Sequence, residues 1–361
     1  AEDDDLLPST QGHEFVFQGN FGDVELGASF TAYHYACIKQ QVPITRVQDV
    51  LCRSGILYLG SLSQTFRKFF GQDTVDQIVQ CFTERYWPRD LDVKEDRRQV
   101  QEWFNFLEDE ANLTEASDLI LKAGSNPRNR KLWLYILNAM ERLAQSQTST
   151  NKSEATVMTR YVVPLLEVFL NKPQNNVILD TPNTIAKVVQ HRKQLKDEKQ
   201  GKRPDVRLSA VDINGDMVIE IGHGEIKSGK HDKGGAAVSR DLVRVGLFMK
   251  DQLDAADDTY GVSNSLSLGM QFNGCKALFF LMSKCRNFYI MMQVATMTIP
   301  DSIATLSKVS SEYKLWRQLE KAVVDGYQPL IDAIRKGRSG VLKEHFPTTT
   351  SPDLNKIKTK Y

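Results

Sequence analysis

The chain has 361 residues, of which 41% are hydrophobic and 25% are charged, and its formal net charge is +1. These values are typical of a globular protein with one large domain or two modest ones. A net charge this close to zero excludes a long-range attraction of the whole molecule to nucleic acid or to a membrane surface, so any basic surface must be local.

The five cysteines form no Cys-x-x-Cys pair, and their odd number leaves at least one thiol unpaired. This pattern favours reduced thiols over a disulfide framework and argues against a structural zinc site. The longest apolar stretches are too short to span a bilayer. We therefore expect an intracellular protein, in the nucleus or the cytoplasm, with no membrane partner.

Residues 1–125 are expected to form a helical accessory region. From residue 43 onwards, apolar side chains recur at steps of three and four residues, which is the period of an amphipathic helix. The cluster Gly124-Ser125-Asn126-Pro127 breaks this pattern, and we place a domain boundary near it. The accessory region is a candidate binding surface for a protein partner.

Residues 126–346 are expected to form the second domain, and residues 347–361 a flexible tail. Helices are predicted over residues 131–144 and 153–170, with Ser153 as the N-cap of the second. A polar, basic stretch over residues 183–203 leads into a predicted hairpin over residues 205–227. A helix over residues 239–253, strands over residues 275–282 and 287–297, and a closing helix over residues 313–333 follow. From Ser153 the order is therefore helix, strand, strand, helix, strand, strand.

The hairpin carries most of the recognisable chemistry of the sequence. Asp205 follows a proline at the start of the first strand, and Glu225 and Lys227 lie two residues apart on the second. Residues two apart on a strand share one face, so the carboxylate and the ammonium group of the second strand point the same way.

The register of the hairpin decides whether Asp205 joins them. A two-residue turn at Asn214-Gly215 would set Asp205 opposite Gly224 and point it away from Glu225. We expect instead a three-residue loop, Asn214-Gly215-Asp216, or a bulge with the same effect, either of which sets Asp205 opposite Glu225.

These residues and the order of the elements resemble the PD-(D/E)XK nuclease superfamily. More narrowly, Arg203-Pro204-Asp205, Gly222-His223-Gly224-Glu225-Ile226-Lys227 and Arg240-Asp241-Leu242 are similar to a group of uncharacterised fungal nuclease-like proteins, and more distantly to the nuclease modules of Crinkler-type effectors. The resemblance covers roughly residues 153–300. It implies an α/β fold with a restriction-endonuclease-like αβββαβ core and a mixed sheet, here preceded by the helical accessory region.

The resemblance also implies a nuclease that depends on Mg²⁺ or Mn²⁺ and cuts nucleic acid, with DNA expected rather than RNA. Asp205, Glu225 and the carbonyl of Ile226 would hold the cation, and Lys227 would orient the attacking water or stabilise the developing charge. Glu154, on the preceding helix, would support the site, and Glu167 on the same helix ranks second.

Contacts with the phosphate backbone are expected from basic side chains and from two glycines on the second strand. Gly222 and Gly224 would let the phosphates approach closely. The basic side chains expected to bind phosphates without regard to sequence are Lys230, Lys233, Arg240 and Arg244.

Each of these residues also has a plainer explanation. Asp205 would cap a turn after proline, Glu225 and Lys227 would form an exposed ion pair, and Glu154 would be an acid favoured by the helix dipole. Two alternatives to the enzyme stay open: a catalytically inactive nuclease fold that binds nucleic acid or a protein partner, and a purely structural interaction protein.

Overall fold

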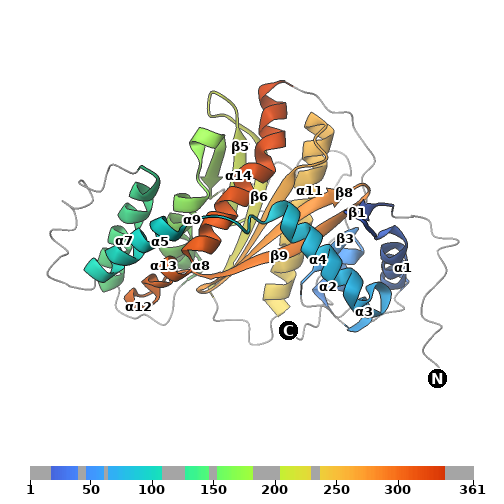
Figure 1. The fold of residues 1–361 in the computed structure, drawn as a ribbon, viewed down its shortest axis with the longest axis horizontal. Helices are drawn as coiled ribbons and strands as arrows, with labels where there is room; N and C mark the ends of the chain where they lie inside the picture. Colours follow the sequence, from blue (N-terminus) through green and yellow to red (C-terminus); the bar gives the residue numbers. More distant parts are fainter. Residues whose placement is uncertain are drawn as a thin grey trace.

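A mixed β-sheet forms the centre of the protein (Figure 1). The computed structural model describes residues 18–39, 46–60, 64–107, 127–145, 153–181, 204–228 and 236–337. Within these residues seven strands pair in the order β3-β9-β8-β7-β6-β5-β4. Their bounds are β3 Ile56–Leu59, β4 Val177–Asp180, β5 Val206–Val211, β6 Met217–Lys227, β7 Leu266–Asn273, β8 Lys276–Cys285 and β9 Phe288–Thr298.

Most neighbouring strands of the sheet are antiparallel, and two pairs are parallel. Strands β4 to β6 pair antiparallel in sequence order, as do β7 to β9. The pairs β6–β7 and β3–β9 are parallel. A parallel pair needs a crossover connection, and helix α11 (Ala236–Tyr260) lies between β6 and β7 in the chain.

Helices cover both faces of the sheet. Helix α11 packs on one face, against β6 and β7, and α14 (Tyr313–Arg335) packs against β7 from the other face (Figure 1). The remaining described helices are α1 Gly27–Ile38, α2 Val47–Cys52, α3 Gln64–Phe70, α4 Gln72–Tyr86, α5 Lys94–Leu107, α7 Pro127–Gln145, α8 Glu154–Val157, η4 Met158–Val162, α9 Val163–Phe169, η5 Pro173–Asn175, α12 Ile303–Leu306 and α13 Lys308–Ser311. A two-stranded ladder, β1 (Asn20–Phe21) and β2 (Val24–Glu25), lies ahead of α1.

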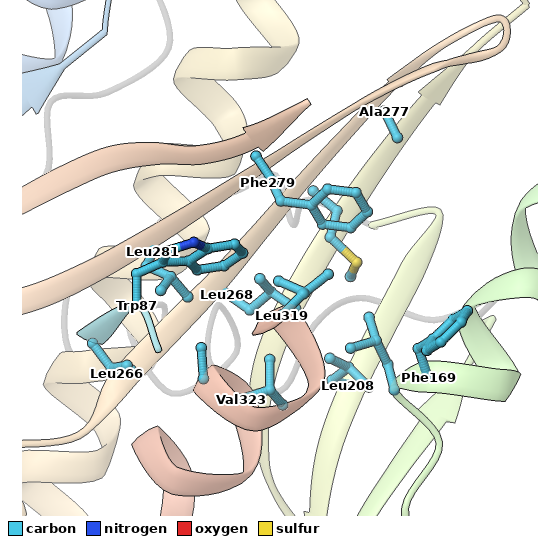
Figure 2. Packing of buried hydrophobic residues seen from close by; sticks show 14 of the residues in the cluster. Trp87, Phe169, Leu208, Leu266, Leu268, Ala277, Phe279, Leu281, Leu319 and Val323 are labelled. Carbon is cyan, nitrogen blue, oxygen red and sulfur yellow. The ribbon is translucent and has the colours of Figure 1, made fainter. Parts of the chain in front are cut away.

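The alternation of side chains along β7 explains this layering. Its apolar residues face α14 and belong to the main core, where Leu266 and Leu268 lie near Leu319 and Val323 (Figure 2). Its other residues face α11. At Gly269 an added Cβ would lie 2.4 Å from the sulfur of Met249, so the glycine lets α11 approach the sheet closely.

The described part of the amino-terminal region contributes one strand to the sheet and is therefore not purely helical. Strand β3 lies within it and pairs with β9, and Val50 and Leu51 of α2 join the core cluster formed by α11. The expectation of a helix around Ile56 is therefore wrong. A strand buried on both faces is a continuous apolar run, which periodicity alone does not distinguish from a buried helix. The boundary expected near residue 125 does not divide the sheet.

Most of the elements predicted between Ser153 and Ala333 are present. Ser153 accepts a hydrogen bond from the backbone of Thr156 at 3.1 Å and caps α8, as expected. Helix α11 is longer than predicted, and strands β4 and β7 were not predicted. The observed order is a helix, then β4, β5 and β6, then α11 and β7, in a mixed α/β sheet.

The helix that begins at Glu154 widens into a π-helical turn over Met158–Val162. Pro164 follows this turn and has no N–H to donate to the carbonyl of residue 160. In a regular α-helix the proline ring would also clash with that carbonyl. The backbone N–H of Val163 donates to the carbonyl of Met158, five residues back. The wide turn therefore carries the chain past the proline without ending the helix.

None of the described helices is both long enough and apolar enough to cross a membrane.

Candidate functional site

The β5–β6 hairpin reaches the register that the site requires by a route different from the expected loop. Asp212 caps the connection, because its side chain accepts hydrogen bonds from the backbone of Asn214 at 2.8 Å and of Asp216 at 3.0 Å. The first pair of the ladder is Val211 with Met217. The predicted three-residue loop is therefore wrong, since an unshifted ladder from this pair would set Asp205 opposite His223.

Two bulges on β6 correct this offset. The register shifts by one residue between Ala210 and Val211 and again between Leu208 and Ser209, so Val206 pairs with Gly224. Asp205 lies one residue beyond this last pair, and its carboxylate lies against the backbone of Ile226, next to Glu225 in the chain. One bulge alone would have turned Asp205 to the other face, because side chains alternate along a strand. The alternative expectation was a bulge with the same effect: the structure has two bulges on β6, and the direct pairing of Asp205 with Glu225 stays a prediction.

The Asp205 carboxylate is held against the edge of β6. Its Oδ2 accepts a hydrogen bond from the backbone N–H of Ile226 at 2.7 Å, and its own backbone N–H donates to the carbonyl of Gly224 at 2.9 Å. Burial raises the pKa of Asp205, while the bond from Ile226 and the charge of Lys227 oppose this rise. The site thus holds a carboxylate at a fixed position beside Glu225.

Glu225 is the more deeply buried of the two acids. Its side chain is 3% exposed, and its Oε2 lies 3.3 Å from Nη1 of Arg244 on α11. Its other oxygen, Oε1, accepts no hydrogen bond from the described residues. Burial raises the pKa of Glu225 to about 8, and the nearby charges of Asp205 and Asp241 add to this effect.

Lys227 lies on the same face and contacts both helices beside the strand. Its Nζ is 3.4 Å from Oε1 of Glu154 on α8, 3.6 Å from Oδ2 of Asp241 on α11, and 3.3 Å from the carbonyl oxygen of Ile226. Burial lowers the pKa of Lys227, but the carboxylates around it outweigh that effect and leave it raised. The lysine is therefore held as a cation.

Asp241 and Arg244 join the site in ways that the sequence did not predict. In the sequence, Asp241 is only one residue of the Arg240-Asp241-Leu242 motif, and no role is predicted for it. In the structure its side chain is 4% exposed, and its Oδ1 lies 2.9 Å from Nη1 of Arg244. Arg244 was expected to bind phosphate, but its guanidinium group bridges Asp241 and Glu225. The spacing of three residues on a helix, which sets side chains on one face, was the available signal.

Other predicted residues have different places. Glu154 contacts the site, whereas Glu167 is an exposed residue of α9 with no contact to Lys227 among its described interactions. Arg240 is exposed on α11. Lys230 and Lys233 lie outside the described residues.

The expectation for Gly222 and Gly224 is wrong. An added Cβ on Gly224 would lie 3.3 Å from the Cβ atoms of Met270 and Val206, and one on Gly222 would lie 3.3 Å from the Cβ of Leu208. Both glycines therefore face the core on the side of the sheet opposite Glu225. The alternation that puts Glu225 and Lys227 in the site turns these neighbours away from it.

A buried charged network continues the site along the same face. Arg207 donates to Oε1 of Glu220 at 2.9 Å and to Oδ2 of Asp180 at 2.5 Å. The other oxygen of Glu220 lies 3.3 Å from Nε2 of His223, whose ring stacks on Phe248 of α11. This network fixes the strands next to Glu225, and it places His223 in a structural role.

Within the described residues no three His, Cys, Asp or Glu side chains are arranged to hold a metal ion. The predicted set uses two carboxylates and the backbone carbonyl of Ile226, so it stays a prediction. In the comparisons with known proteins, no family model, curated protein or solved structure matches the chain.

Proposed function

We propose that this chain is a nuclease that hydrolyses phosphodiester bonds with a divalent cation, and that DNA is its substrate. The observation that carries the proposal is the hydrogen bond of the Asp205 carboxylate to the backbone N–H of Ile226, at 2.7 Å, which places this acid beside the strand segment that carries Glu225 and Lys227. The order of the elements supports the finer assignment to a restriction-endonuclease-like fold: a helix, three antiparallel strands, α11, and a strand parallel to the third.

The residues present fit a hard divalent cation. Carboxylate and carbonyl oxygens are the ligands that Mg²⁺ and Mn²⁺ prefer, and Oε1 of Glu225 is a buried acceptor with no donor among the described residues. Four carboxyl groups of the described site lie around two cationic side chains, so the acids outnumber the bases even when Glu225 holds its proton. Asp205, Glu225 and the carbonyl of Ile226 are the groups that would hold the cation.

When bound, such a cation supplies a nucleophilic water at neutral pH and stabilises charge on the phosphoryl oxygens. The side chains of the chain have separate tasks. The raised pKa of Lys227 keeps its ammonium group charged, so it can donate to a phosphoryl oxygen or hold the attacking water. Glu154, which is 52% exposed, restrains this ammonium group from the solvent side.

The test is a cleavage assay on supercoiled plasmid, single-stranded DNA and RNA, with Mg²⁺, Mn²⁺ or EDTA. We expect cleavage only with a cation, and loss of at least about 100-fold in rate in Asp205→Asn and Lys227→Ala, as for other groups that stabilise a transition-state charge. Lys321→Ala is the matched control, because this lysine forms an ion pair with Asp325 on α14, away from the site.

Two outcomes would contradict the proposal. Cleavage that survives both site substitutions would belong to a contaminant or to another site. Salt-sensitive binding of DNA with no cleavage under any condition would favour the inactive binding module.

A further inference from the structure

Three buried oxygen atoms belong to side chains in and next to the site. Oε1 of Glu225, Oδ2 of Asp241 and Oε1 of Gln271 accept no hydrogen bond from the described residues. Their residues are 3%, 3% and 2% exposed, respectively. Buried polar atoms in native proteins are nearly always paired with protein or ordered water, so three such atoms on neighbouring side chains of one site leave room for water or for a ligand.

Gln271 lies beside Glu225 on the neighbouring strand. The two residues are partners in the parallel ladder of β6 and β7, so their side chains rise from the same face. The amide Nε2 of Gln271 donates to the carbonyl of Val238 at 2.5 Å. This bond ties β7 to the first turns of α11 and leaves the amide oxygen as the atom without a partner.

Asp241 lies one helical turn beyond Val238 and therefore on the same side of α11. Arg244 links its Oδ1, at 2.9 Å, to Glu225, at 3.3 Å. Its Oδ2 lies 3.6 Å from Nζ of Lys227, which makes an ion pair but no hydrogen bond. The orphaned oxygen of Asp241 thus belongs to the same group of side chains as that of Glu225.

The chemistry of the three atoms limits the ligand that they suit. The Asp241 carboxylate and the Gln271 amide oxygen are acceptors, so an anion such as phosphate would add further acceptors and leave both of them unpaired. A divalent cation attracts the carboxylates, and Mg²⁺ and Mn²⁺ sites usually keep several coordinated waters, each of which donates hydrogen bonds. Residues that accept hydrogen bonds around a metal site typically change its affinity by about 10- to 100-fold when they are replaced.

We propose that Asp241 and Gln271 are positioning residues of the cation site, which orient Glu225 and accept hydrogen bonds from water molecules of a hydrated Mg²⁺ or Mn²⁺ ion. This inference rests on the proposed function, because it takes the cation to be held by Asp205, Glu225 and Ile226. It adds one residue from α11 and one from β7, and neither is among the acids and the lysine of the hairpin.

The test is calorimetric titration of the full chain with MnCl₂, which measures binding without any need for cleavage. We expect Asp241→Asn and Gln271→Met to weaken the binding of Mn²⁺ by about 10- to 100-fold. Asparagine keeps the acceptor for Arg244 and removes the charge, and methionine keeps the volume of glutamine and removes the amide oxygen.

Matched controls come from α11 itself. Asp257→Asn removes the charge of a buried aspartate that pairs with Lys284 at 2.8 Å, and Gln252→Met removes an amide that accepts from Ser267 at 2.6 Å. Both lie on the far half of the helix, so both should bind Mn²⁺ as the wild type does.

The outcomes separate the two proposals. Wild-type affinity in both Asp241→Asn and Gln271→Met, together with lost binding in Asp205→Asn, would overturn this inference and leave the cation site standing. No binding of Mn²⁺ by the wild type would overturn the cation site itself. If Asp241→Asn does not fold, as judged by circular dichroism, Gln271→Met decides the question alone.

Discussion

Replacing Glu225 by glutamine should stabilise the protein at alkaline pH and should give no comparable gain at acidic pH. The buried carboxyl has a pKa of about 8 against an ordinary value of 4.5. Between these values the folded protein keeps a proton that the unfolded chain releases, so the free energy of unfolding falls as pH rises. Each pH unit in this window removes about 1.4 kcal/mol, which gives a total of roughly 5 kcal/mol at most.

The assay is urea unfolding, followed by circular dichroism, at several pH values from 4.5 to 9 in buffer with EDTA. The wild type and Glu225→Gln share every other titrating group, so the difference between their unfolding free energies isolates Glu225. This difference should be smallest near pH 4.5, grow in favour of glutamine up to about pH 8, and then level off. Asp325→Asn, which alters a carboxylate that is 59% exposed, is the control and should change stability by less than about 1 kcal/mol throughout. A difference between wild type and Glu225→Gln that stays flat from pH 4.5 to 9 would refute the reasoning.

Three further substitutions test the site and its support. Glu154→Gln should slow cleavage by less than about tenfold. The ion pair between Glu154 and Lys227 contributes less than about 1 kcal/mol, because the glutamate side chain is 52% exposed. A loss of rate as large as that of Lys227→Ala would contradict this. Gly269→Ala should lower the free energy of unfolding by about 1–3 kcal/mol in urea titrations, because the new methyl group would lie 2.4 Å from the sulfur of Met249 and push α11 off the sheet. Lys250→Met should lower the free energy of unfolding by about 1–3 kcal/mol in the same assay, because Asp254 loses a charged donor at 2.6 Å while it keeps the hydroxyl of Tyr289 and the ion pair with Lys284 at 3.8 Å. An unchanged unfolding midpoint would contradict this.

The two acids of the hairpin could be predicted from the sequence. The register of the two strands could not, and the sequence showed only which register the site would need. Alternation fixes that Glu225 and Lys227 share a face. The residue of β6 that lies next to Asp205 depends on the register of the hairpin. The turn residues Asn214-Gly215 do not indicate the bulges that lie further along β6, between Met217 and Gly222. A bulge adds one residue to one strand, and the residues of the turn do not indicate where it lies.

Strands β3 and β7 were missed for different reasons. Strand β3 is four apolar residues buried on both sides, and nothing in such a run separates a strand from a helix. Strand β7 alternates apolar residues with Ser267, Gly269, Gln271 and Asn273. This period of two is typical of a strand, so the sequence does contain the signal for β7. With β7 missed, Gln271 could not be related to Glu225.

The roles of Asp241 and Arg244 could not be predicted because they depend on the placement of a helix on a sheet. Their spacing puts both on one side of α11, but only the packing of that helix against β6 shows that this side faces Glu225. From the sequence, Arg244 was expected to bind phosphate. In the structure, its guanidinium group links the carboxyl groups of Asp241 and Glu225.

The two bulges of β6 separate the loop of the hairpin from its acid pair. The extra residues lie between Met217 and Gly222, so the partner of Asp205 is fixed by the strand and not by the length of the connection at Asp212–Asp216. Insertions in that connection should therefore be tolerated, and it is a suitable place for an epitope tag or a fluorescent label. Deletion of a single residue between Met217 and Gly222 would instead move Asp205 to the opposite face of the sheet. Related sequences should therefore vary in the length of the connection but not in the length of this part of β6.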